Sequence, residues 1–335
     1  MIIETEPDVW RLQTKPASDD GKSIADYCLD NNVIAIGWSL HNDTLNERDI
    51  SESEKNELKN LRDNISNFEE YVSIYPKFYG GSVSKQIYTL HNDIKINDLI
   101  WMRYLGKYYL ARVGINSKWQ YSSNKSVIRR DASNQRTDIA WIEIGEESDV
   151  PGGVTTAFIR GRSIQHIRKD GIKEYSMYIY NKKTNGDKYK INLNGKLSPM
   201  NMFYHYISPS GCEDLVCMYL YKQHGYICIP STNKKSTELY ECVLLNPKNG
   251  HKIYIQVKCG QCDLDALDYM HLDGDVYLFT SGGKVKNINQ TKNISVIYPD
   301  ELFKFAFSRE NRFILPKNIL TWCEMITKIR TDINL

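Results

Sequence analysis

The sequence predicts a two-domain protein. Residues 1–175 are expected to form an α+β domain built as a small barrel, and residues 201–335 an α/β domain with a central mixed sheet. Three observations predict this. Many short strand-like segments occupy the first half. The order helix, strand, hairpin, helix, strand fills the second half. Between them, residues 176–200 are rich in turn-forming residues, which indicates a linker.

Composition sets the broad class of the protein. The chain has 335 residues, a net charge of +2 and 41% hydrophobic residues, which is typical of globular domains and not of disordered chains. No apolar run approaches the roughly 18–20 residues that cross a bilayer, so no membrane association is expected. The opening sequence MIIETEPDVW lacks the basic start and apolar core of a signal peptide. We therefore expect a cytoplasmic protein.

The first half alternates between helix and strand signals. Ser23 can cap a helix that runs to Asn31, because apolar residues follow it at helical spacing. A charged segment at 46–64 lacks an apolar stripe and is expected to be a solvated insertion. A further helix is expected at 68–75. Strands are expected at 9–14, 33–38, 98–103, 107–113, 119–121, 139–144 and 155–159.

Four sequence segments in this half resemble a known superfamily. VIAIGW (33–38), INDLIWMRYLGKYYLARV (96–113), WQY (119–121) and AWIEIG (140–145) look like the PUA-like superfamily, which includes EVE, ASCH and YTH domains. The resemblance covers about the first 165 residues. It implies a compact barrel that recognises nucleic acid, and several members of the superfamily hold an extruded modified base in an aromatic pocket.

Tryptophans are concentrated in this half of the chain. A flipped base is held by stacking on aromatic rings, worth about 1–3 kcal/mol per base. Trp38 follows a glycine, and Trp119 and Tyr121 lie in a polar, loop-like segment, so these three are candidates for an aromatic cage. The alternative is that they are core residues, which we expect for Trp10 and Trp101.

Two basic clusters could contact phosphates. Arg129 and Arg130 lie among serines and asparagines, and Arg160 and Arg162 form an RGR triplet. Arginines with interleaved polar residues suit phosphate binding, which supplies affinity but no sequence choice. Solvated basic loops are an equally good interpretation for any one of these residues.

A hairpin in the second half carries candidate chemistry. Tyr240–Leu245 and Lys252–Lys258 are strand-like and are joined by the turn sequence NPKNG. Glu241 can then lie beside Gln256 and Lys258 on one face. A carboxylate, an amide oxygen and an ammonium suit Mg²⁺-assisted phosphodiester hydrolysis. An ordinary amphipathic hairpin is the alternative.

The elements around this hairpin resemble the PD-(D/E)XK nuclease family, particularly its branch related to restriction endonucleases. The resemblance implies Glu241 and Gln256 as ligands of Mg²⁺, and Lys258 as the residue that positions the attacking water. Glu213, on the preceding helix, corresponds to a further acidic residue of the family. Glu238 competes with Glu241 for the first acidic position. The chain lacks the Pro-Asp pair of the family, and Gln256 replaces the commoner acid, which lowers the charge that would hold the metal.

The cysteines do not predict a metal site. Cys217, Cys228 and Cys242 lie in apolar elements, as reduced core thiols do. Cys259 and Cys262 form a C-x-x-C motif, but no second pair stands at zinc-finger spacing.

These observations favour a metal-dependent DNA endonuclease of restriction or phage-defence type. The first domain would recognise a specific or modified base in double-stranded DNA, and the second would cut, as a homodimer where both strands are cleaved. A conventional enzyme that reads an unmodified sequence through the major groove is a close variant. A non-catalytic DNA- or RNA-binding protein with a degenerate nuclease fold is the alternative.

Overall fold

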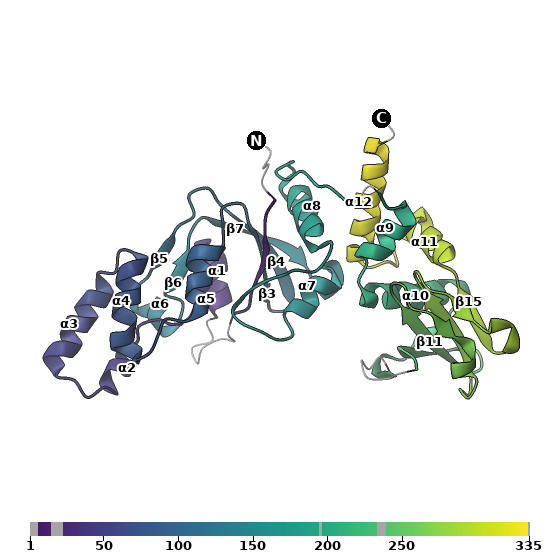
Figure 1. Cartoon of the computed structure of the whole chain (residues 1–335), viewed down its shortest axis with the longest axis horizontal. Coiled ribbons are helices and arrows are strands. Elements are labelled where there is room, and N and C mark those ends of the chain that lie inside the picture. Colours follow the sequence, from purple (N-terminus) through teal and green to yellow (C-terminus); the bar gives the residue numbers. More distant parts are fainter. Residues whose placement is uncertain (1–5, 15–22, 194–195, 233–238, 334–335) are drawn as a thin grey trace. The chain divides into compact units, whose positions relative to one another are not determined.

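The computed structural model describes residues 6–14, 23–193, 196–232 and 239–333 (Figure 1). It divides into two compact units. Unit 1 comprises residues 1–147 and 154–191, and unit 2 comprises residues 148–153 and 192–335. Across the described part of the chain, no helix has both the length and the apolar character needed to cross a membrane.

A five-stranded sheet forms the centre of unit 1. Its strand order is β7 (Ile139–Gly145), β4 (Lys107–Val113), β3 (Leu99–Tyr104), β1 (Val9–Leu12) and β8 (Ile164–His166). Strand β1 is parallel to β3, and all other neighbours are antiparallel. The β3–β4 hairpin matches the predicted one and turns through Leu105 and Gly106, both in the left-handed region.

A second sheet lies apart from the first. Its three antiparallel strands are β2 (Ile34–Ile36), β6 (Asn134–Arg136) and β5 (Trp119–Tyr121). Asp138, with a φ of 58°, interrupts the extended chain between β6 and β7 and separates the two sheets. Among the described residues no closed barrel forms, and the predicted barrel is therefore wrong.

Side-chain caps begin most of the helices of unit 1. The helices are α1 (Ile24–Asn31), α2 (Asn42–Asn46), α3 (Glu52–Asp63), α4 (Phe68–Tyr79), α5 (Lys85–Tyr88), α6 (Lys125–Arg129), α7 (Gly152–Ala157) and α8 (Ile172–Thr184). The first two residues of α7 belong to the segment assigned to unit 2. Ser23 caps α1, as the sequence predicts, and its side chain and that of Asp26 together form a capping box. The charged insertion contains α3, whose residues are mostly exposed and which packs beside α4.

Both sheets and helices α1 and α4 contribute to one hydrophobic core. Trp10 and Trp101 are buried, as predicted. The indole N–H of Trp10 donates to Asp98 at 2.8 Å, and that of Trp101 donates to Ser176 at 2.9 Å. Because both indole N–H groups find partners, these large rings can be buried without leaving an orphaned donor.

Two segments differ from their prediction. Residues 155–159, expected as a strand, lie in and just after helix α7. The expected linker at 176–200 begins inside α8, where Tyr175 and Ile179 recur at helical spacing and are buried. Amphipathic periodicity therefore continues past the predicted domain end, and the boundary between the units falls after Ile191.

Unit 2 contains the central mixed sheet that the sequence predicts. Its strand order is β15 (Ile294–Ile297), β13 (Asp275–Thr280), β11 (Lys252–Lys258), β10 (Cys242–Leu245) and β9 (Ile227–Cys228). Strands β15, β13 and β11 are parallel, and β11, β10 and β9 are antiparallel. The helix expected after the hairpin does not form. Residues 263–272 instead contain the short strand β12 (Leu264–Asp265), which pairs with β14 (Val285–Lys286), and a 3-10 turn.

The two faces of this sheet bury different groups. The helices of unit 2 are α9 (Pro199–Tyr206), α10 (Pro209–His224), α11 (Pro299–Phe307) and α12 (Lys317–Ile333). Val243 and Tyr254 face a core completed by the turn after β12. On the opposite face lie Cys242 and Ile255, against helix α10. Helices α11 and α12 are separated by residues 308–316, and α12 begins directly after Pro316.

Candidate functional site

The predicted hairpin brings together three of the candidate residues. Cys242 pairs with Ile255 in the β10–β11 ladder, so Glu241 lies opposite Gln256. Lys258 is two residues further along β11 and projects to the same face. It stands at the carboxyl end of β11, beside Thr280 at the carboxyl end of the parallel strand β13. In open α/β sheets, ligands bind at the carboxyl ends of parallel strands.

The Lys258 ammonium lies between two oxygens. It donates to Glu241 Oε1 at 3.3 Å. With its amide oriented to satisfy both ends, Gln256 accepts from Lys258 Nζ at 2.8 Å and donates to the carbonyl of Leu239 at 3.3 Å. Gln256 is only 1% exposed, whereas the side chains of Glu241 and Lys258 are 23% and 38% exposed. A buried amide thus orients a solvent-accessible carboxylate–ammonium pair.

The oxygen atoms in this arrangement are of the kind that Mg²⁺ binds. The carboxylate of Glu241 and the amide oxygen of Gln256 are hard oxygens, and both already contact a cationic group, Lys258 Nζ. Mg²⁺ commonly takes one or two protein carboxylates and completes its shell with water and substrate phosphate. The single carboxylate makes the site weakly charged, so phosphate would be an essential partner.

The other acidic candidates lie elsewhere. Glu213 is half-buried on α10, the helix that packs on the Cys242 face of the sheet, opposite to the Glu241 side chain. Glu238 lies outside the described residues. Tyr269, which the sequence did not single out, is buried near Glu241. Burial raises the pKa of the Tyr269 phenol, and the charges of Asp268 and Glu241 contribute.

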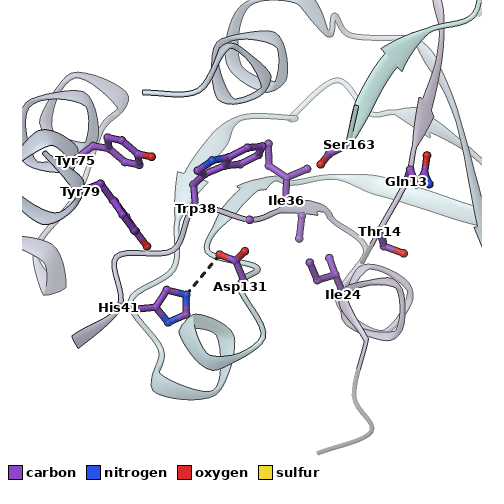
Figure 2. A pocket seen from close by; sticks show the side chains of 12 residues that line it. Gln13, Thr14, Ile24, Ile36, Trp38, His41, Tyr75, Tyr79, Asp131 and Ser163 are labelled. Carbon is purple, nitrogen blue, oxygen red and sulfur yellow. Dashed lines mark ion pairs between the residues drawn. The ribbon is translucent and has the colours of Figure 1, made fainter. Parts of the chain in front are cut away.

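Unit 1 contains a pocket of about 470 Å³ (Figure 2). Small-molecule sites commonly measure about 300–1,000 Å³. Figure 2 shows the Trp38 ring in the wall, with Tyr75 and Tyr79 of α4 on one side and Asp131 nearby. The lining residues are Gln13, Thr14, Ile24, Ala35, Ile36, Gly37, Trp38, His41, Tyr75, Tyr79, Asp131 and Ser163.

The pocket is built on strained backbone. Trp38 has a φ of 64° and Asp131 a φ of 55°, both in the left-handed region. For a bulky residue such as tryptophan this conformation costs about 1–3 kcal/mol and persists only where neighbours enforce it. Strain of this kind concentrates at binding sites.

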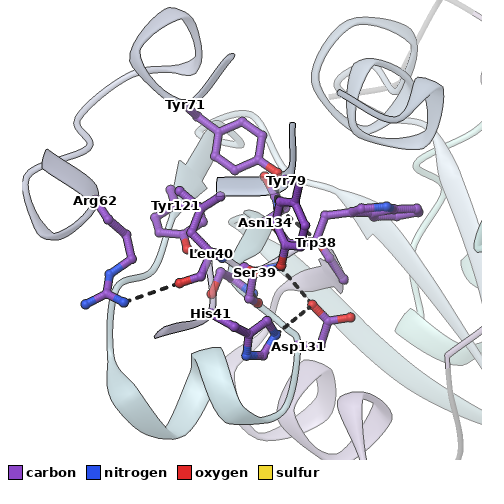
Figure 3. Close-up of polar contacts among 12 residues, drawn as sticks. Trp38, Ser39, Leu40, His41, Arg62, Tyr71, Tyr79, Tyr121, Asp131 and Asn134 are labelled. Carbon is purple, nitrogen blue, oxygen red and sulfur yellow. Dashed lines mark hydrogen bonds and ion pairs between the residues drawn. The ribbon is translucent and has the colours of Figure 1, made fainter. Parts of the chain in front are cut away.

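Side chains hold the backbone of residues 37–41 from several directions (Figure 3). The Trp38 carbonyl accepts from Tyr71 Oη at 2.9 Å and from Asn134 Nδ2 at 3.3 Å. The N–H of Leu40 donates to Tyr121 Oη at 2.8 Å, and its carbonyl accepts from Arg62 at 3.3 Å. These contacts over-determine the loop and fix the orientation of the Trp38 ring.

Asp131 anchors the same loop from the pocket side. Its Oδ1 accepts from the N–H of Ser39 at 2.8 Å and lies 3.6 Å from His41 Nε2. Gly37 permits this close approach, because a Cβ at that position would lie 2.4 Å from Asp131 Oδ2. Burial raises the pKa of Tyr79, and the charge of Asp131 contributes. The pocket therefore combines a carboxylate acceptor with aromatic and aliphatic walls.

The predicted cage residues have different positions. Trp38 lines the pocket, whereas Trp119 and Tyr121 pack behind it on the core. The rings of Trp119 and Tyr121 lie 5.8 Å and 5.4 Å from that of Tyr71. Burial raises the pKa of Tyr121 to about 12. Trp119 and Tyr121 thus support the loop that carries Trp38.

The basic residues flank the pocket. Arg129, exposed, and Arg130, which lies over the Tyr27 ring, directly precede Asp131. Arg160 and Arg162 are exposed and precede the lining residue Ser163. The buried Arg11 holds this second segment by donating to the Arg162 carbonyl at 2.7 Å and to Gln165 at 2.9 Å.

Residues 10–156 match a family model described as Domain of unknown function (DUF8426). No curated protein and no solved structure matches the chain. The matched segment covers less than half of the chain and includes most of the pocket, from Gln13 to Asp131.

Of the pocket residues, only Trp38 was singled out from the sequence. Those that were missed include every other aromatic or titratable lining residue: His41, Tyr75, Tyr79 and Asp131. Tyr75 and Tyr79 stand four residues apart on α4, a spacing that places both on one helix face. That spacing was visible in the sequence. The approach of Asp131 to Gly37 was not, because 94 positions separate them along the chain.

Proposed function

We propose that this protein is a Mg²⁺-dependent endonuclease that recognises a modified base in double-stranded DNA. The observation that carries the catalytic part is the Lys258 ammonium held between Glu241 Oε1 and the Gln256 amide oxygen. The mixed sheet around these residues supports a restriction-endonuclease-like unit. Cutting both strands at one site would take two copies of the chain.

The chemistry follows from the positions of the three side chains. Bound Mg²⁺ would polarise the scissile phosphate and acidify a water molecule. Glu241 and Gln256 would hold it, and Gln256, being buried, would keep the site oriented. Lys258, freed from Glu241 on metal binding, would orient the attacking water or stabilise charge on the phosphate.

The pocket of unit 1 supports recognition of an extruded base. Trp38 offers a face for stacking, and the Asp131 carboxylate can accept a hydrogen bond from an exocyclic amino group, as carboxylates do from cytosine N4. Ile24 and Ile36 line the wall and would contact an added methyl group. A cytosine that carries a substituent at its 5-position matches this combination best.

The arginines before Asp131 and Ser163 would contact the phosphates on either side of an extruded nucleotide. Such contacts provide affinity without sequence choice. Joining a reader to a cutter raises the concentration of cleavable backbone near the recognised base.

The test is a cleavage assay on four matched duplexes that carry cytosine, 5-methylcytosine, 5-hydroxymethylcytosine or N6-methyladenine, with Mg²⁺ or with EDTA. We expect Mg²⁺-dependent nicking or cutting of a 5-substituted cytosine duplex, and its loss in Glu241→Gln. Binding without cleavage in every condition would favour the non-catalytic alternative. Neither binding nor cleavage of any duplex, with RNA bound instead, would refute the proposal.

A further inference from the structure

Three cysteines of unit 2 converge on one point. Cys217 comes from α10, Cys228 from the edge strand β9 and Cys242 from β10. Their Sγ atoms all lie within 4.8 Å of one another, and those of Cys217 and Cys242 are 3.6 Å apart. The sequence predicted these as separate core thiols, because 11 and 14 residues separate them and no metal-binding spacing is visible.

Sheet pairing explains how they meet. Cys228 pairs with Leu244, and Cys242 lies two residues before Leu244 on the same strand, so both thiols project to one face. Helix α10 covers that face and supplies Cys217. The three thiols therefore occupy fixed positions on three elements.

We propose that Cys217, Cys228 and Cys242 form a zinc site. In a tetrahedral zinc–thiolate centre with Zn–S bonds of about 2.3 Å, neighbouring sulfurs lie about 3.8 Å apart. The 3.6 Å between the Sγ atoms of Cys217 and Cys242 agrees with this value, and the other two distances do not exceed 4.8 Å. An iron–sulfur cluster, which has several metal atoms, needs a wider set of thiols. Thiolates select soft or borderline ions over Mg²⁺.

The fourth position belongs to an oxygen ligand. Asp214 lies one helical turn before Cys217, a spacing that places both on the same face of α10. Asp214 is exposed, and its carboxylate lies outside the set of ligand atoms within 4.8 Å of one another, so either a rotated Asp214 side chain or water would complete the tetrahedron.

The surroundings suit metal entry. Cys217 and Cys228 are half-buried and Cys242 is buried, so an ion can enter from one side. A zinc ion here would join the two-residue strand β9 to α10 and β10. The C-x-x-C pair contributes nothing to this set, because Cys259 interacts instead with Cys212.

The test is the metal content of the purified, reduced, full-length chain by mass spectrometry. We expect about one zinc ion per chain. In Cys217→Ser, Cys228→Ser and Cys242→Ser, bound zinc should fall by about tenfold or more, since each loses a thiolate ligand. Cys323→Ser is the matched control. It removes a buried thiol of the same unit, whose Sγ donates to the Ala306 carbonyl at 3.5 Å, and it should retain zinc.

Cobalt titration of zinc-stripped wild-type protein gives a readout that does not depend on the variants folding. A sulfur-to-cobalt charge-transfer band with tetrahedral d–d bands is expected. Asp214→Asn should alter the d–d bands and leave the charge-transfer band, if the carboxylate is the fourth ligand; unchanged d–d bands would assign that position to water. Folded wild-type protein that takes up neither zinc nor cobalt would overturn the proposal. So would selective uptake of Cu(I) in competition with zinc, or an intact mass two hydrogens lighter, which marks a disulfide.

Discussion

Replacing Gly37 by alanine should destabilise unit 1 and damage the pocket together. A Cβ at this position would lie 2.4 Å from Asp131 Oδ2 and 3.0 Å from its Cγ, which is closer than real Cβ contacts allow. The Asp131 side chain must therefore move away. It would lose the 2.8 Å hydrogen bond that it accepts from the N–H of Ser39.

The magnitude follows from that bond. Hydrogen bonds to charged groups contribute about 1.5–3 kcal/mol, so we expect a loss of about 2 kcal/mol in the free energy of unfolding. For a unit of this size, about 1 kcal/mol corresponds to a Tm change of roughly 2–4 °C, which predicts a fall of about 4–8 °C. DNA binding should weaken as well, because the displaced carboxylate could no longer accept the hydrogen bond that we propose from an extruded base.

Thermal unfolding followed by tryptophan fluorescence is the assay, because Trp10, Trp38, Trp101, Trp119 and Trp141 all lie in unit 1. Gly81→Ala is the matched control. A Cβ added at Gly81 would meet no atom within 4 Å, and the backbone there has no left-handed φ. The free energy of unfolding of this control should therefore change by no more than about 0.5 kcal/mol. Equal Tm values for the two variants would refute the reasoning about Asp131.

Three further predictions concern separate parts of the molecule. Trp38→Ala should weaken binding of the preferred duplex by about 1–3 kcal/mol, measured by fluorescence anisotropy, while Trp38→Phe keeps a stacking face and most of the affinity. Equal affinities of Trp38→Ala and the wild-type protein would show that the ring takes no part in recognition. Burial raises the pKa of Tyr121 from its ordinary value of about 10 to about 12, so the neutral phenol contributes stability that is full below pH 10 and lost as pH rises through 12. Between pH 10 and 12, the free energy of unfolding in urea should decline less in Tyr121→Phe than in the wild-type protein. An identical decline in both proteins would contradict the raised pKa of Tyr121. Gln256→Glu adds a carboxylate beside Glu241, so half-maximal cleavage should need several-fold less Mg²⁺, and an unchanged or higher requirement would argue against Gln256 as a ligand.

The sequence predicted the local elements better than their assembly. The β10–β11 hairpin and its alternation placed Glu241, Gln256 and Lys258 on one face, because strand period and turn chemistry are local properties. Ser23 as the cap of α1 was equally readable. Helix α7 was missed because the β-branched residues of VTT favour strand, and local propensity does not include the packing that overrides it.

Long-range contacts explain the features that the sequence predicted wrongly or missed. The barrel prediction failed because pairing between distant strands, and the break at Asp138, cannot be read from short apolar phrases. Trp119 and Tyr121 looked like exposed loop residues, yet both pack on Tyr71, which lies about 50 positions away. The three-cysteine cluster was invisible for the same reason, since strand register and helix packing create it.

We propose that Lys258 belongs to a hydrolytic site. The most direct test of this proposal is single-turnover cleavage of the preferred duplex by Lys258→Met, with Lys252→Met as the control on the same strand. Lys252 pairs with Asp273 at the other end of β11, and its side chain is 51% exposed. We expect the cleavage rate of Lys258→Met to fall by about 10²-fold or more while its DNA binding is retained. The cleavage rate of Lys252→Met should change little. Cleavage by Lys258→Met at the wild-type rate would contradict the proposal.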